Sequence, residues 1–529
     1  MKRRTPDELR AALERPGFTP ALRDAQGLLE LLGEAGRVAA EPLERALVRI
    51  GPPVVSRLLS SFPEAAPPLR GRLCRLLGRL APGEVVVREL LLRALEDGDE
   101  ATRRHAATAL GQLREPEVEA ALLRAWRSAG SDAFRRALAE ALGKVGSTAA
   151  LAALRAARPE DPELARRVAR AVLMLERTAS RSETSTLRGQ VAPVEPQPLL
   201  FTCRAGLEPL LVDELGPEWQ PRAVGPGQVE AQLGGPLEAA WSARLATEFA
   251  FVLPTVDRGR DEPLVDVVVR LLTGPTASGI LRRWTAGPIR YRIAFAGGGH
   301  RRAVVWEVAR RVAAARPELL NDPTDSPWEL RVVEREGHVR AALCPRGLAD
   351  PRFAWRVADV PASSHPTLAA ALARVGGVQR DDVVWDPFVG AGAELLERAR
   401  LGPFARLLGT DGDERALAAA RRNAQAAHVE LELVRGEATT FAPPQAPSLV
   451  LTNPPMGRRT GGHRELGGLL ERFVAHAAAV LAPGGRLVWL APQPARTDAH
   501  AKAAGLVLDV RYELDMGGFR ATLQRWRKR

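Results

Sequence analysis

Apolar residues recur at spacings of three and four through the first 180 residues, which predicts short amphipathic helices. Similar segments return at intervals of 33 and 32 residues, at Leu77-Gly78-Arg79-Leu80, Leu110-Gly111-Gln112-Leu113 and Leu142-Gly143-Lys144-Val145. One helix pair cannot bury its own apolar face, so successive pairs must stack. We therefore expect an all-α solenoid over residues 1–180.

Basic pairs stand early in several of the repeated helices. They are Arg103-Arg104, Arg135-Arg136 and Arg166-Arg167, and each follows an acidic residue, Asp99, Asp132 or Asp161. The acidic residues stand where helix N-caps are expected. The pairs indicate either a ridge that faces RNA or a protein, or simply a solvated helix face.

The pattern changes near residue 200. Residues 181–198 are rich in Ser, Thr, Pro and Gln and lack periodicity, which indicates a linker. From residue 199 onward, short apolar strands alternate with helices, so the fold class changes to α/β. We place one α/β domain at residues 199–355 and a second at residues 356–529.

Four successive strands of the second α/β domain end in small or acidic groups. Those ends are Asp386 with the turn through Gly390 and Gly392, then Asp411, Gly436-Glu437 and Asn453. In an open α/β sheet, ligands bind at the carboxyl ends of the strands. Glycines let the backbone approach a cofactor, and an acid at the tip of the second strand can accept the hydroxyls of a ribose. A Rossmann-like domain that binds a nucleoside cofactor follows from this pattern.

Composition narrows the class of protein. The chain has 529 residues, 46% of them apolar, with no apolar run long enough to span a membrane. Its net charge is +12, and the last 79 residues hold 13 basic against 6 acidic side chains, so we expect a polyanionic partner. Three widely spaced cysteines fit neither a disulfide framework nor a metal site, and they favour the cytoplasm.

The second α/β domain resembles class I methyltransferases that use S-adenosyl-L-methionine and modify exocyclic amines. Asn453-Pro454-Pro455-Met456 matches their motif (N/D)-P-P-(aromatic), except at its last position. The Asn453 side-chain oxygen and the Pro454 carbonyl can accept the two hydrogens of an amine. This draws the nitrogen lone pair out of conjugation and orients it for methyl transfer.

Residues 199–529 resemble the tRNA guanine-N2 methyltransferases that carry an N-terminal THUMP module. The resemblance lies in the strand Leu199–Cys203 followed by Gly206-Leu207-Glu208, and in Gly457-Arg458-Arg459, Gly461-Gly462 and Leu481–Val488 beyond the N-P-P motif. It implies that residues 199–355 bind RNA, that the substrate is a guanine of tRNA, and that rRNA is an alternative.

Ile50–Val55 resembles a HEAT repeat, so the solenoid is expected to be HEAT-like and to dock a protein partner.

The resemblance also implies roles for single residues. The cofactor would be held by Ser364, Thr367, Asp386, Phe388, Gly390, Gly392, Asp411, Glu437 and Asn453, with the methionine moiety at Asp386 and the glycines, the ribose at Asp411 and the adenine at Glu437. The catalytic segment would be Asn453, Pro454, Pro455 and Met456. No metal is implied.

Three positions depart from the family pattern. Ala391 and Ala393 stand where family members have Ser and Thr, and Met456 replaces an aromatic residue that stacks on the target base. Phe388 or Trp385 could compensate for the missing ring. Two alternatives therefore stay open beside tRNA guanine-N2 methylation: methylation of rRNA guanine N2 or adenine N6, and a catalytically silent RNA-binding scaffold.

Overall fold

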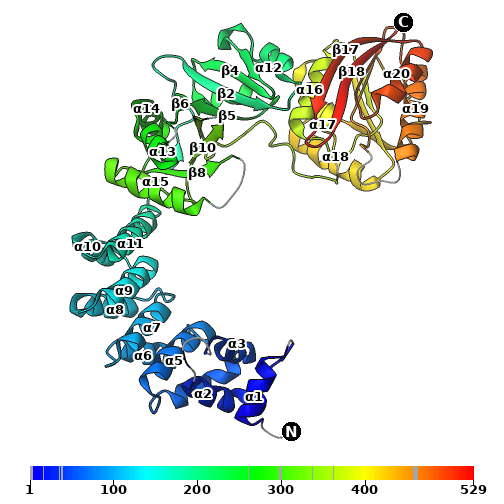
Figure 1. Cartoon of the computed structure of the whole chain (residues 1–529). Coiled ribbons are helices and arrows are strands. Elements are labelled where there is room, and N and C mark those ends of the chain that lie inside the picture. The colour runs from blue at the N-terminus through cyan, green and yellow to red at the C-terminus, as the bar shows by residue number, and fades with distance from the viewer. Residues whose placement is uncertain are drawn as a thin grey trace. The chain divides into compact units, whose positions relative to one another are not determined.

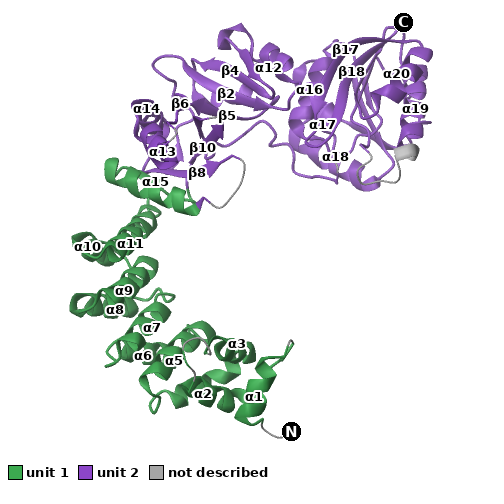
Figure 2. Ribbon diagram, in the orientation of Figure 1, with its two compact units in different colours: residues 1–184, 302–325 green, residues 185–301, 326–529 purple. Residues whose placement is uncertain are grey.

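The computed structural model describes residues 4–529 except 16, 35, 37–39, 260, 297–300, 336, 362 and 457–462, and only the backbone of 463–465. The chain forms two compact units (Figure 2). Unit 1 holds residues 1–184 and 302–325, and unit 2 holds residues 185–301 and 326–529. The boundary that we expect between residues 199–355 and 356–529 therefore falls inside unit 2.

Unit 1 is an α-solenoid, as the repeat pattern predicts (Figure 1). Its helices are α1 (Pro6–Leu13), α2 (Ala25–Glu34), α3 (Ala40–Ile50), α4 (Val55–Ser61), α5 (Pro67–Leu80), α6 (Val85–Ala94), α7 (Glu100–Leu110), α8 (Pro116–Ser128), α9 (Asp132–Val145), α10 (Thr148–Ala156) and α11 (Pro162–Ser180). One continuous apolar core runs through all of them. This is how stacked repeats bury faces that no single repeat could bury alone.

The repeated Leu-Gly segments explain how closely the helices stack. A Cβ placed on Gly78 would collide with Ala109, one on Gly111 would lie 2.9 Å from Ala141 Cα, and one on Gly143 would lie 2.8 Å from Ala171 Cα. In each case the glycine of one helix meets an alanine of the helix one repeat further on. The sequence motif is therefore a packing motif that joins α5, α7, α9 and α11.

Replacing Gly143 with alanine should destabilise the solenoid, although it lies inside a helix where alanine is intrinsically better by about 1 kcal/mol. The added Cβ would sit 2.7 Å from Ala171 Cβ, and overpacking of this kind costs about 1–3 kcal/mol. Faster amide hydrogen exchange in α9 and α11 would report the loss. The matched control is Gly279→Ala in α14, where nothing lies within 4 Å of an added Cβ. Equal effects of the two substitutions would contradict the packing role.

The arginine pairs are engaged within the solenoid. Arg136 pairs with Asp161 at 3.1 Å, and Arg167 pairs with Glu140 at 2.7 Å. Asp161 is an N-cap as expected, and so is Asp99, whose carboxylate accepts from Thr102 N–H at 2.7 Å. The expectation for Asp132 is wrong, because Ser131 caps α9 and Asp132 is its first residue.

Residues 302–325 add a helix and a short strand to unit 1. They form α15 (Arg302–Ala315) and β9 (Leu319–Asn321), and Ala309 and Leu320 share an apolar cluster with Leu173 of α11. Arg181 donates to both carboxylate oxygens of Asp322 at 2.7 Å, and Asp322 is fully buried. Burial opposes the charge on Asp322, but the bonds from Arg181 and from backbone N–H groups outweigh it and hold its pKa far below the usual value.

Unit 2 begins with a mixed α/β region. It contains β1 (Thr186–Leu187), β2 (Gln197–Cys203), α12 (Glu208–Leu215), β3 (Arg222–Gly225), β4 (Gln228–Leu233), β5 (Ala246–Val252), β6 (Val256–Asp257), α13 (Leu264–Thr273), α14 (Pro275–Trp284), β7 (Thr285–Ala286), β8 (Ile289–Phe295), β10 (Trp328–Arg335) and β11 (His338–Cys344). The strands pair in the order β3-β4-β2-β5-β11-β10-β8. The segment that we interpret as a linker supplies β1, which pairs with β7.

The last part of unit 2 is a seven-stranded sheet in the order β14-β13-β12-β15-β16-β18-β17. Its elements are α16 (Pro366–Gly376), β12 (Val383–Asp386), α17 (Ala393–Leu401), β13 (Arg406–Asp411), α18 (Glu414–Ala427), β14 (Glu432–Arg435), β15 (Leu449–Thr452), α19 (His463–Val480), β16 (Arg486–Ala491), α20 (Pro494–Ala503), β17 (Leu506–Asp515) and β18 (Arg520–Lys528). Helices α16, α17 and α18 pack on one face, and α19 and α20 pack on the other (Figure 1). The strand order reverses at β12, where such sheets bind ligands.

A buried carboxylate fastens the amino ends of the central strands. Asp382 directly precedes β12 and has no exposed surface. It accepts hydrogen bonds from Arg398 at 2.8 Å, from Arg486 at 2.8 and 2.9 Å, and from Ser448 Oγ at 2.7 Å. These partners come from α17, from β16 and from the residue before β15. Asp382 therefore ties the ligand-binding strands together at the end opposite their carboxyl ends.

Among the described residues, no single helix is both long and apolar enough to cross a membrane. Helices α13 and α14 reach that length and composition only together, and they meet at a bend of 50°.

Candidate active site

Asp386 closes β12 and is fully buried at the carboxyl edge of the sheet. Its Oδ1 accepts a hydrogen bond from Thr452 Oγ1 at 2.6 Å and another from Phe388 N–H at 3.1 Å. Its Oδ2 is buried with no hydrogen-bond partner in the described part of the chain. Burial, followed by the nearby Glu394 carboxylate, raises the pKa of Asp386 well above its usual value. A buried acceptor without a donor is costly, so a ligand with a donor would be bound there favourably.

The turn after β12 adopts backbone conformations that favour glycine. Gly390 has φ of +50° and Gly392 has φ of +85°. A Cβ on Gly392 would also press on Ala420 Cβ at 3.3 Å. Gly390 N–H donates to Asp411 Oδ2 at 3.1 Å, which joins the turn to the end of β13. The turn thus leaves backbone, without side chains, facing the space beside Asp386 and Asp411.

The predicted ribose and adenine positions lie side by side. Asp411 is half-buried, and its Oδ1 accepts from Asp413 N–H at 3.0 Å. Gly436 N–H donates to the Asp411 carbonyl at 3.2 Å, which brings Glu437 to the same edge. Glu437 is exposed, and its Oε1 lies 3.4 Å from where a Cβ on Gly412 would stand. The two carboxylates are therefore placed at neighbouring strand ends.

Asn453 follows β15 and takes part in a chain of hydrogen bonds. Its Nδ2 donates to Ser364 Oγ at 2.8 Å, and Ser364 Oγ donates in turn to Glu394 Oε1. The Asn453 Oδ1 atom is buried and has no hydrogen-bond partner among the described residues. The side chain therefore offers an unused acceptor, which is what an amine donor requires.

Glu394 is a site residue that the sequence analysis missed. It is 3% exposed in the first turn of α17, and burial raises its pKa to about 7 against the opposing hydrogen bond from Ser364. An acid directly after a glycine turn was the available signal. The helical pattern alone does not show that this side chain points inward.

The remaining predicted residues are distributed as follows. Thr367 is buried in the first turn of α16, and its hydroxyl pairs with His365 Nδ1 at 2.8 Å. Phe388 is half-buried and meets the Phe473 ring edge-on at 5.3 Å between centroids. Pro454 is buried, Pro455 is exposed and Met456 is half-buried. Gly457–Arg459 and Gly461-Gly462 lie outside the described residues.

One of the noted departures, Ala393, has a structural explanation, and the structure also tests one of the proposed compensations. Ala393 packs in an apolar cluster with Trp355, Ala369, Leu396 and Ala424, so a hydroxyl there would be buried among carbon atoms. Trp385 is fully buried and donates to Thr410 Oγ1 at 3.1 Å. The idea that Trp385 compensates for the missing base-stacking ring is therefore wrong, whereas Phe388 stays a candidate for that role.

Two protein-family models match separate parts of the chain. Residues 354–508 match the RMKL-like methyltransferase domain family, and residues 51–133 and 87–174 match HEAT repeats. The ribosomal RNA large subunit methyltransferase K/L of Shewanella baltica is 39% identical to this chain over 94 residues. The match covers 17% of this chain and 13% of that protein.

One relative matches over most of its length. The tRNA (guanine(6)-N2)-methyltransferase of Thermus thermophilus is 31% identical over 317 residues, which is 56% of this chain and 89% of the relative. The crystal structure of TrmN from Thermus thermophilus aligns with a TM-score of 0.50 at 26% identity, over 63% of this chain and all of that one. The chain therefore belongs to the family of the tRNA (guanine(6)-N2)-methyltransferase of Thermus thermophilus.

Proposed function

We propose that this chain transfers a methyl group from S-adenosyl-L-methionine to the exocyclic N2 amine of a guanine in tRNA. The observation that carries the proposal is the unpartnered Oδ1 of Asn453, together with the equally unpartnered Oδ2 of Asp386 at the end of the neighbouring strand. Asn453 Oδ1 can accept a hydrogen bond from an amine of the substrate, and Asp386 Oδ2 can accept one from a donor group of the cofactor. Both lie at the switch point of the sheet, and the family relationship supplies the reaction class.

The residues present fit the cofactor. Asp386 Oδ2 can accept from the ammonium group of its methionine moiety, the Gly390–Gly392 turn leaves room for its backbone, and Asp411 can accept from its ribose hydroxyls. Glu437 is placed to accept from the adenine amine. When bound, S-adenosyl-L-methionine supplies an electrophilic methyl group on a sulfonium. No group of His, Cys, Asp and Glu side chains in the described residues has the arrangement of a metal site.

The N-P-P segment acts on the substrate amine. Asn453 Oδ1 and the Pro454 carbonyl accept its two hydrogens, so its lone pair points at the methyl group. With S-adenosyl-L-methionine bound, the amine held by Asn453 and Pro454 would take its methyl group, the electrons of the broken carbon–sulfur bond would stay on sulfur, and the amine would release one proton to water. The two prolines stiffen the turn, and Met456 can press on the face of the extruded base.

RNA binding is assigned to residues 199–355 as a THUMP-like region, together with the basic C-terminal segment. The relative acts on tRNA, which favours tRNA here. We propose a cytoplasmic location, because its three cysteines are free and buried rather than paired in disulfides, as expected in a reducing compartment. We infer no membrane partner.

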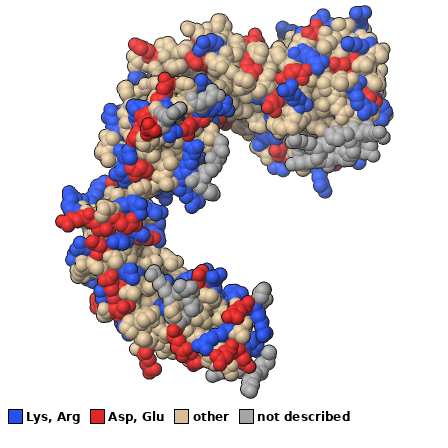
Figure 3. All heavy atoms as spheres, viewed as in Figure 1, with Lys and Arg blue, Asp and Glu red and all other residues tan. Residues whose placement is uncertain are grey.

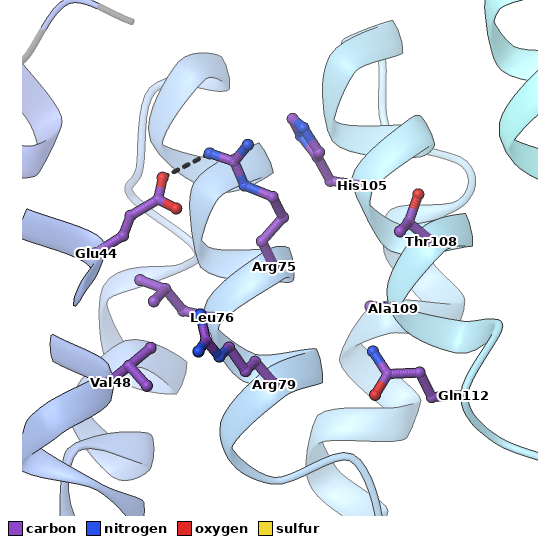
Figure 4. Close-up of a pocket in the computed structure, with 9 residues that line it drawn as sticks. All are labelled: Glu44, Val48, Arg75, Leu76, Arg79, His105, Thr108, Ala109 and Gln112. Carbon is purple, nitrogen blue, oxygen red and sulfur yellow. Dashed lines mark hydrogen bonds and ion pairs between the residues drawn. The ribbon is translucent and has the colours of Figure 1, made fainter. Parts of the chain in front are cut away.

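The HEAT solenoid is proposed to dock a protein rather than RNA. Acidic and basic side chains alternate on the face drawn in Figure 3. A pocket of about 280 Å³ between α3, α5 and α7 shows the same mixture, because Arg75 in its wall is paired with Glu44 at 2.5 Å (Figure 4). Paired charges cancel the positive potential that a phosphate backbone requires. Reversing Arg79, an exposed side chain in this wall, to glutamate should leave tRNA affinity unchanged in a filter-binding assay.

Mass spectrometry of nucleosides tests the proposed reaction. Deleting the gene should remove N2-methylguanosine from tRNA, and the purified chain with S-adenosyl-L-methionine should restore it. Loss from rRNA instead would favour the alternative that the Shewanella baltica relative supports. Loss of N6-methyladenosine would move the assignment to adenine, and no change in any nucleoside would favour a silent RNA-binding scaffold.

A further inference from the structure

Resting on the proposed function, we propose that Ser364 and Glu394 are positioning residues that fix which end of the Asn453 amide faces the substrate. An asparagine amide has an acceptor end and a donor end of nearly equal shape. Only the oxygen end can accept the hydrogens of an exocyclic amine. Some contact must therefore decide between two orientations that differ by a half-turn of the amide.

The orientation of the Asn453 amide is set by which atoms of the hydrogen-bond chain Asn453–Ser364–Glu394 can donate a hydrogen. Above its pKa of about 7, Glu394 is an ionised carboxylate that can only accept, so the single hydroxyl hydrogen of Ser364 is then directed to Glu394 Oε1. Ser364 Oγ can then only accept from Asn453, which must present Nδ2, at the observed 2.8 Å. Asn453 Oδ1 is left facing away without a partner. This direction of hydrogen bonding leaves Asn453 Oδ1 free to accept from the substrate amine, which is the orientation that methyl transfer requires.

Burial and a hydrogen bond from Arg356 hold the chain Asn453–Ser364–Glu394 in place. Ser364 and Glu394 are 9% and 3% exposed, so water competes little for their hydrogen bonds. Arg356 donates to the Ser364 carbonyl at 2.6 Å, which anchors the segment before α16. Arg356 also favours the charged form of Glu394, whereas Asp386 and Glu397 oppose it. Ser364 bonds to both residues and so connects Glu394 to Asn453.

This arrangement gives a reason for an otherwise costly residue. A carboxylate buried this deeply is usually less favourable than an apolar side chain of similar size. Replacing Glu394 with leucine should therefore leave the stability of unit 2 unchanged or raise it. It should nevertheless slow methylation, because the freed Ser364 hydrogen would turn to Asn453 Oδ1 and reverse the amide.

Steady-state kinetics of the full chain with tRNA and S-adenosyl-L-methionine tests the inference. Ser364→Ala and Glu394→Leu should each lower kcat by up to about tenfold, the rate equivalent of one hydrogen bond. The KM for tRNA should stay within about twofold for both variants. The Kd for S-adenosyl-L-methionine, measured by calorimetry, should stay within about twofold for Glu394→Leu, because Glu394 is not among the expected cofactor contacts. The double variant should be no slower than either single variant, because both act on the same amide.

The decisive comparison is made in the Asn453→Asp background, which keeps an N/D-P-P motif. A carboxylate has two equivalent oxygens and needs no orientation. Ser364→Ala should therefore change kcat by less than about twofold in that background, against up to about tenfold in the wild type. Equal losses in the two backgrounds would overturn the positioning role and leave Ser364 a merely structural residue.

Two further readouts separate this inference from the proposed function. A wild-type chain that methylates no RNA would refute the proposed function, whatever Ser364 does. A crystal structure of Ser364→Ala needs no activity: we expect the Asn453 side chain to lose its single conformation. An Asn453 side chain held as in the wild type would overturn the inference on its own.

Discussion

Replacing Asn453 with alanine should lower kcat for methyl transfer by at least about 100-fold, while the Kd for S-adenosyl-L-methionine stays within a few-fold. The side chain supplies the unpartnered Oδ1 acceptor at the end of β15. Removing one preorganised polar group from an active site typically costs about 2.7–4 kcal/mol of transition-state stabilisation. The proposed cofactor contacts at Asp386, Gly390 and Asp411 belong to other strand ends and stay in place.

Transfer of a radiolabelled methyl group to tRNA measures the rate, and calorimetry measures cofactor binding. Asn453→Asp is the matched control, since it keeps an oxygen at the same position and should retain far more activity than the alanine variant. Normal methylation by Asn453→Ala would show that the amine is held elsewhere. Loss of cofactor binding would instead show that Asn453 acts mainly as one of the expected cofactor contacts rather than on the substrate amine.

Replacing Asp382 with asparagine should destabilise unit 2 by about 3–5 kcal/mol. Asp382 is bonded to two arginines: the Arg398 side chain has no exposed surface and the Arg486 side chain is 9% exposed. Removing the negative charge leaves two nearly buried cations without compensation. Because these contacts join α17, β15 and β16 to β12, the loss should spread through the sheet.

Urea unfolding followed by tryptophan fluorescence checks this, since Trp385 and Trp489 lie buried in the affected sheet. The neighbouring Asp381 is exposed, and Asp381→Asn should change the free energy of unfolding by less than about 0.5 kcal/mol. If both variants unfold at the same urea concentration, the buried network contributes little.

The pH dependence of the same network has a definite sign. Burial disfavours the charge on Asp382, but hydrogen bonds from Arg398, Ser448 and the backbone outweigh it and lower its pKa below the usual value. A carboxyl group with a lowered folded-state pKa stabilises the protein above its unfolded pKa of about 3.9. This contribution should be lost as the pH falls below that value, and the loss should be smaller in Asp382→Asn.

Much of the candidate site could be predicted because strand ends are readable from a sequence. Parallel strands bring their carboxyl ends to one edge, so Asp386, Asp411, Glu437 and Asn453 could be grouped from the pattern of apolar runs alone. The glycine turn was equally readable, because Gly390 and Gly392 adopt positive φ angles that other residues rarely accept.

The direction of side chains on helices, and the packing of the helices, were harder to predict from the sequence. Glu394 stands among apolar and charged residues of α17, and only the packing of that helix on the sheet turns its carboxylate toward Ser364. The same limit applies to α15. The helix lies within residues 199–355, which we expect to form one α/β domain, yet its packing against Leu173 of α11 places it in unit 1.

The sequence by itself determined the solenoid, the α/β class of the region that follows it, the strand ends of the candidate site and the family, because each depends on local periodicity or on a short motif. Only the tertiary structure decided which polar atoms are left unpartnered, that Asp382 holds two arginines, and that Ser364 links Asn453 to Glu394. The physical reason is that a hydrogen bond depends on distances between residues far apart in the chain, here 89 positions for Asn453 and Ser364. No periodicity records such a distance.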